Sequence, residues 1–175
     1  MATRFPYRET IFGLEDSIVS TLGVVVGIAA GTDSRYIVIL SALVVLVVES
    51  LSMTAGTYLS NKSQMELDLA SGRHGFLSRR HLISKSISDS LFMGISYSLG
   101  GVISVLPFFF FSPLNAIVPA VTLSVVLLFS IGYIKGKMAK INPLRSGLEM
   151  SLVSLSAALL GYLIGVFART NLMKI

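Results

Sequence analysis

The sequence has no cysteine and little charge, and both absences narrow what the chain can be. Without cysteine it can form no disulfide and no thiolate metal site, so a metal ion would need oxygen, imidazole or thioether ligands. Charged residues make up 13% of the 175 residues, whereas hydrophobic residues make up 53%. Soluble domains carry about twice that share of charge. With a mean hydropathy of +0.80, the composition predicts an integral membrane protein without room for a second, soluble domain.

Five apolar segments are each long enough to cross a bilayer, which takes roughly 20 helical residues. We expect these spans at about 12–31, 36–59, 87–111, 115–134 and 148–168. The sequence therefore predicts an all-α membrane protein in which residues 1–175 form a single five-helix transmembrane domain. Residues 60–86 are expected to form a short basic cytoplasmic loop. No signal peptide is expected, because residues 1–12 are polar and no small-residue cleavage site follows a short apolar core.

Lysine and arginine are unevenly divided between the two sides of these spans. Eleven of the fourteen lie before the first span, between the second and third, or between the fourth and fifth. The positive-inside rule then places the N-terminus in the cytoplasm and the C-terminus outside the cell or in an organelle lumen. The net charge of +5 is thus explained by topology, which argues against nucleic-acid binding.

The first span carries an acid at the head of a stripe of small residues. Asp16, Ser20, Gly23, Gly27 and Gly31 follow one another at spacings of four, three, four and four, which places them on one face of a helix. The glycines would let another backbone approach closely. An ionisable residue inside a membrane is costly, so Asp16 is a functional candidate. Alternatively, Asp16 could lie near the helix start, where the helix dipole favours a negative charge.

A second acid, Glu49, lies near the middle of the second span, roughly 15 Å from its cytoplasmic end. Met53 follows one turn closer to the cytoplasm, at a depth similar to that of Asp16. A carboxylate with a thioether suits Fe(II) or Mn(II), whereas carboxylates alone would suit Mg²⁺ or Ca²⁺ equally. Met53 could instead fill the core. Glu49 could be a structural acid hydrogen-bonded to Ser52 or to another helix, and burial of its neutral form would also allow it to carry protons.

Four blocks of the sequence, in order, resemble the vacuolar iron transporter family of proton-coupled Fe(II)/Mn(II) exporters: 12–27, 49–60, 100–108 and 142–150. The resemblance implies a homodimer whose ion path lies between the protomers and is lined mainly by the first helices, with Gly23, Gly27 and Gly31 at the interface. It places the family's translocation aspartate on Asp16 and its pathway methionine on Met53. The family's pathway glutamate would fall on Val45, one turn from Glu49.

The same resemblance sets expectations for the loop at 60–86. Plant and fungal-parasite members of the family carry a long acidic, metal-collecting helical domain after the second helix. Here the loop is short and basic, so the chain resembles a short member without that cytoplasmic domain. The membrane would be the plasma membrane in a prokaryote and the vacuolar membrane in a eukaryote.

Together these features predict a proton-coupled transporter that exports Fe(II), with Mn(II) as a second substrate, and that needs no cofactor. The expected partners are a second copy of the chain, the lipid bilayer and divalent metal ions. We expect no enzymatic activity, because no paired nucleophile and base, phosphate loop or metalloprotease spacing is present. Two alternatives stay open: a non-transporting membrane scaffold whose glycines only pack helices, and a transporter of another divalent cation.

Overall fold

The computed structural model describes residues 5–71 and 76–171, with the backbone alone for 76–81, and this part of the chain folds into five long α-helices. They are α1 (Tyr7–Gly31), α2 (Arg35–Ala70), α3 (Phe76–Phe110), α4 (Pro113–Met138) and α5 (Pro143–Asn171). Each contains a stretch long and apolar enough to cross a membrane. The all-helical class and the number of membrane-spanning candidates agree with the prediction from sequence.

Short polar or proline signals fix where several helices begin. The hydroxyl of Ser34 accepts a hydrogen bond from the backbone N–H of Ile37 at 3.4 Å and so caps α2. The side-chain oxygen of Asn142 accepts from the N–H of Leu144 at 3.1 Å at the start of α5. Pro113 stands in the first turn of α4, where a missing N–H costs nothing. These signals keep the connections between helices short.

The segment at 60–86 is largely helical, which corrects the loop predicted there. α2 continues to Ala70 and α3 begins at Phe76, so both helices run well past the apolar stretches. Lys62 and Glu66 form an ion pair at 3.9 Å, and Gln64 donates to Asp68 at 3.3 Å. Such pairs one turn apart stabilise a helix that has lost its apolar face. Hydropathy marks where the apolar stretch ends, and the helix itself continues beyond that point.

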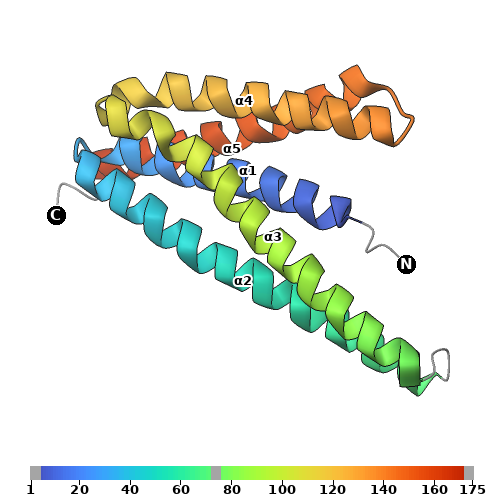
Figure 1. Cartoon of the computed structure of the whole chain (residues 1–175). Helices are drawn as coiled ribbons and strands as arrows, with labels where there is room; N and C mark the ends of the chain where they lie inside the picture. The colour runs from blue at the N-terminus through green and yellow to red at the C-terminus, as the bar shows by residue number, and fades with distance from the viewer. Residues whose placement is uncertain (1–4, 72–75, 172–175) are drawn as a thin grey trace.

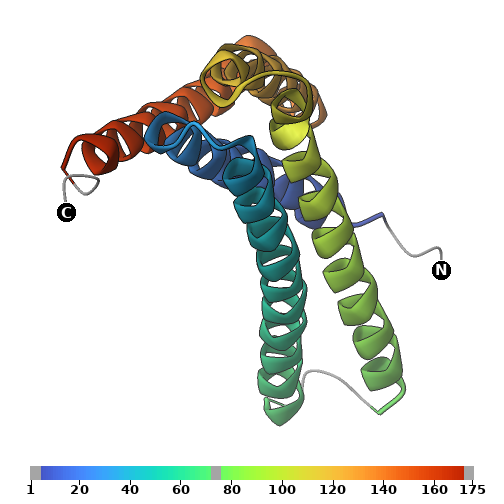
Figure 2. The ribbon, with the colours of Figure 1, turned by 90° about the vertical axis from the view of Figure 1, so that its left-hand side faces the viewer.

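α1 is the central helix and packs against all four others (Figure 1). α5 and α4 cover one side of it, and the α2–α3 pair crosses it on the other side (Figure 2). The far ends of α2 and α3 project beyond the rest of the bundle. At about 1.5 Å per residue, the 36 residues of α2 extend over about 54 Å, well beyond the about 30 Å of a hydrocarbon core. The start of α1, the end of α2 and the α4–α5 connection lie toward the same end, as the predicted sidedness requires.

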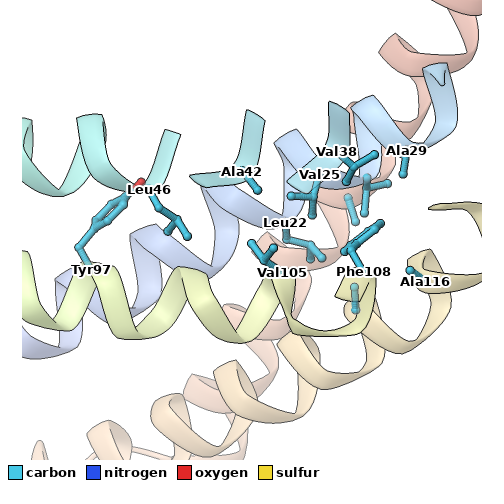
Figure 3. Close-up of a cluster of buried hydrophobic side chains, with 13 residues drawn as sticks. Leu22, Val25, Ala29, Val38, Ala42, Leu46, Tyr97, Val105, Phe108 and Ala116 are labelled. Carbon is cyan, nitrogen blue, oxygen red and sulfur yellow. The ribbon is translucent and has the colours of Figure 1, made fainter. Parts of the chain in front are cut away.

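The main buried cluster lies in the half of the molecule that contains the α1–α2 and α3–α4 connections. Leu22 and Val25 of α1 pack there with Leu46 of α2 and with Val105 and Phe108 of α3 (Figure 3). Figure 3 also shows Tyr97 reaching from α3 toward α2 at the inner edge of this cluster. The cluster fills the space between the helices with apolar side chains, so this half of the single chain is closed by packing.

The outer surface carries many large apolar side chains, as a lipid-facing surface must. Leu51 on α2 is 66% exposed, and Ile164 and Phe167 on α5 are 67% and 64% exposed. In water a surface of this kind would be an aggregation hazard. In a bilayer it faces hydrocarbon, and the helices satisfy their own backbone hydrogen bonds.

Candidate functional site

A cavity of about 900 Å³ opens at the end of the molecule where α1 begins and α4 ends. Its lining contains three thioethers, from Met53, Met93 and Met138, and two carboxylates, from Glu9 and Glu15. Hydroxyl and amide groups from the polar face of α2 complete the lining, at Ser52, Thr57, Ser60 and Asn61. The combination of carboxylate, thioether and neutral oxygen donors can coordinate divalent transition metals.

Met53 is the predicted metal-path residue that lines this cavity. It is partly buried, and it also packs against the main apolar cluster. Its thioether therefore stands where the packed half of the molecule meets the open cavity. The sequence allowed two interpretations of Met53, as a core filler and as a side chain on an ion path. Its contact with the apolar cluster fits the first, and its place in the cavity lining fits the second.

The carboxylates in this cavity were not predicted as site residues. Glu15 faces Lys135 of α4 at 4.0 Å, and Arg8 lines the same space, so the cavity holds charges of both signs. Glu15 directly precedes Asp16 and therefore points to a different face of α1. A prediction based on the stripe of Asp16 alone could not include it. Only the way in which α4 packs beside α1 brings Lys135 to it.

Glu49 lies in a hydrogen-bonded cluster that joins three helices. The hydroxyl of Tyr97, on α3, donates to Oε2 of Glu49. The hydroxyl of Ser20, on α1, donates to the same oxygen at 3.2 Å and lies 2.7 Å from the Tyr97 hydroxyl. Tyr97 is completely buried, whereas Glu49 and Ser20 are partly buried. Of the partners considered for Glu49, the structure supports another helix and not Ser52.

Asp16 is partly buried on α1 and makes no hydrogen bond or ion pair with any residue that the structure describes. The Ser20–Glu49 contact fixes the register of the antiparallel helices α1 and α2. From that contact Asp16 and Met53 each lie one turn, about 6 Å, toward the cavity end of their own helices. This register agrees with the similar depth expected for the two residues, although the helices diverge toward the cavity end.

The glycine stripe of α1 lies against α5 of the same chain. A Cβ added to Gly27 would stand 2.9 Å from the carbonyl oxygen of Gly161, and one added to Gly31 would stand 3.3 Å from that of Gly165. The backbones are therefore too close for larger residues. Gly23, Gly27 and Gly31 also line a groove of about 720 Å³ that runs along α1 and α5, with Ile37 of α2 at one end. The glycine stripe of α1 therefore packs against α5 within the same chain. Contact between two copies of α1 stays a prediction.

Within the described part of the chain, no three histidine, aspartate or glutamate side chains gather into a group that could hold a metal ion. The three predicted path residues occupy different settings: Met53 at the cavity, Glu49 in its hydroxyl cluster, and Asp16 on α1, one turn from the Ser20 that contacts Glu49. Besides Glu9 and Glu15, sequence reasoning did not assign Ser20 and Tyr97 to the site. Ser20 had a signal, since it shares the stripe of Asp16, whereas Tyr97 lies 48 residues from Glu49 and no spacing in the sequence links the two.

Comparisons with known proteins agree with these features. The sequence model of the VIT family matches residues 7–75 and 68–166, which is nearly the whole chain. An uncharacterized protein of Methanocaldococcus jannaschii is 29% identical over 167 residues, covering 90% of this chain and 87% of its own length. Vacuolar iron transporter homologs 1 and 3 of Arabidopsis thaliana are 26% and 28% identical, each covering 74% of this chain and 68% of its own length. With its five apolar helices, the chain therefore belongs to the VIT family and is a multi-pass membrane protein.

Proposed function

We propose that this protein exports Fe(II), with Mn(II) as a second substrate, from the cytoplasm in exchange for protons. The observation that carries the proposal is the cavity at the end predicted to face the cytoplasm, which Met53 lines together with Glu9 and Glu15. Thioethers favour Fe(II) over the harder Mg²⁺, and carboxylates supply the charge that a divalent ion needs. Membership in the VIT family and the names of its plant relatives support metal transport as the activity.

The path beyond the cavity is proposed to run between two copies of the chain. Inside one chain, Leu22 and Leu46 fill the space beyond the Glu49 cluster. The groove along α1 and α5 begins at Val19 and Ser20 and continues along the glycines of α1, so it follows the same direction on the outer face. A second copy related by a two-fold axis would cover that groove and bring a second Asp16 toward the first.

Two facing Asp16 carboxylates give the proposed dimer a means of coupling metal to protons. Two carboxylates at short range cannot both stay ionised without a cation, so one would hold a proton when no metal is bound. A divalent ion would displace that proton, and protonation from the far side would release the ion. Met53, one turn from the Ser20–Glu49 contact, would supply the softer ligand.

Reconstituted vesicles loaded with an Fe(II) chelator test the proposal. We expect Fe(II) uptake by the wild type and a loss of at least about tenfold in Asp16→Asn, which keeps the size of the side chain and removes its charge. Asp33→Asn is the matched control, because Asp33 lies exposed in the connection between α1 and α2 and pairs with Arg169. A wild type without metal flux would favour the scaffold alternative. Full uptake by Asp16→Asn would remove Asp16 from the mechanism.

A further inference from the structure

The Ser20–Glu49–Tyr97 cluster carries an inference beyond the path residues themselves. Two hydroxyl groups from two helices converge on a single carboxylate oxygen, Oε2 of Glu49. Its other oxygen, Oε1, accepts no hydrogen bond from the described residues. Because hydrogen bonds to a charged acceptor are about twice as strong as neutral ones, this arrangement fixes the carboxylate and leaves one oxygen free.

The position of the cluster relates it to transport. Glu49 lies one helical turn from Met53, which lines the cavity, and Ser20 lines the groove along α1 and α5. The cluster therefore stands between the two spaces that the proposed path would join. Neither Tyr97 nor Glu49 is among the residues that line the two spaces; Tyr97 is completely buried, so it can act on a passing ion only through the partly exposed Glu49.

Tying α2 to α3 does not by itself explain the Tyr97 hydroxyl. At the next residue of each helix, the hydroxyl of Ser98 donates to that of Ser50 at 2.9 Å, and it also lies 3.0 Å from the carbonyl oxygen of Gly94 on its own helix. That contact holds α2 and α3 together without a carboxylate. The Ser98–Ser50 contact can therefore serve as a purely structural reference, against which a role of Tyr97 in orienting Glu49 can be tested.

We propose that Tyr97 and Ser20 are positioning residues that hold Oε2 of Glu49, so that Oε1 is presented as a ligand to the transported ion. The inference rests on the proposed transport function. Removing the Tyr97 hydroxyl frees the carboxylate to rotate and to turn away from the ion. The consequence is weaker ion binding during transport, with little change in the rate once the ion is bound.

The experiment compares Fe(II) uptake kinetics in vesicles for Tyr97→Phe, Glu49→Gln and the double variant. Tyr97→Phe is expected to raise the KM for Fe(II) about tenfold, the range for loss of a hydrogen bond to a charged group, with the maximal rate within about twofold of the wild type. In the Glu49→Gln background the same change is expected to leave KM unaltered, because the group through which Tyr97 acts is already changed. Ser20→Ala is expected to raise KM by a smaller factor.

Two matched controls complete the design. Ser98→Ala removes the neighbouring α2–α3 contact, and Tyr162→Phe removes a tyrosine hydroxyl from the exposed face of α5; both are expected to keep the wild-type KM. An unchanged KM in Tyr97→Phe, or an equal rise with and without the Glu49 carboxylate, would overturn the inference while leaving transport established. An equal rise in Ser98→Ala would reduce Tyr97 to a structural tie. Absence of wild-type Fe(II) uptake would refute the proposed function, and this inference with it.

Discussion

Substitution of Gly161 by alanine tests one of the close backbone contacts between α1 and α5. A Cβ added to Gly161 would lie 2.9 Å from the carbonyl carbon of Gly23 and closer still to its oxygen. Both neighbours are backbone atoms that no rotamer change can move, so α1 and α5 must separate. Overpacking of this kind costs about 1–3 kcal/mol. Alanine recovers about 1 kcal/mol of helix propensity, which leaves a net loss of up to about 2 kcal/mol.

The matched control is Gly56→Ala on α2. A Cβ at Gly56 would meet nothing within 4 Å, so this substitution gains helix propensity without a clash. It is expected to be neutral or to stabilise by about 1 kcal/mol. The two variants, chemically identical, should therefore differ by about 2 kcal/mol, or roughly 4–8 °C in Tm for a chain of this size.

The assay is thermal unfolding of the purified protein in detergent, followed by circular dichroism at the helical band. The chain has neither tryptophan nor cysteine, so intrinsic tryptophan fluorescence and thiol-reactive dyes would give no signal. The wild type and both variants are heated at the same rate, since membrane proteins often unfold irreversibly and the midpoint then depends on the rate. If Gly161→Ala unfolds at or above the temperature of Gly56→Ala, the close α1–α5 contact is refuted.

Two further predictions concern the two ends of the molecule. Met53→Leu keeps the side chain's size but removes its sulfur, so Fe(II) uptake should fall several-fold while the unfolding midpoint changes little. Uptake equal to that of the wild type in parallel vesicle assays would exclude the thioether as a ligand. Arg169→Gln breaks the 2.9 Å ion pair with Asp33 at the other end, and because Asp33 is exposed it should cost less than about 1 kcal/mol and leave Fe(II) flux unchanged. A larger loss of thermal stability or of flux would show that this surface pair does more than hold the helix ends.

The sequence predicted the number of helices because each has its own apolar stretch, a local signal. It predicted the end of α2 and the start of α3 poorly; on α2, the pairs Lys62–Glu66 and Gln64–Asp68 support a polar continuation that hydropathy does not register. A hydropathy threshold reports only whether a segment is apolar enough to lie in the hydrocarbon core. The persistence of a helix in water depends on propensity and on side-chain pairs one turn apart.

The candidate site shows the same division between local and long-range information. Spacing along α1 identified Gly23, Gly27 and Gly31 as a surface for close approach, and the structure supplies α5 as a partner. Spacing along α2 placed Glu49 and Met53 one turn apart. Neither pattern could reveal Tyr97, because its contact with Glu49 depends on how α3 crosses α2 and not on anything within reach along the chain.

Fe(II) uptake by proteoliposomes with and without an acidic lumen tests the central proposal most directly. Exchange of Fe(II) for protons predicts that an acidic lumen accelerates Fe(II) uptake, and that a protonophore returns the rate to that of vesicles without a gradient. Asp16→Asn vesicles should lose at least about tenfold of the uptake and show no stimulation by the gradient. Wild-type vesicles that take up no Fe(II), or that take it up equally fast with and without the gradient, would contradict the proposal.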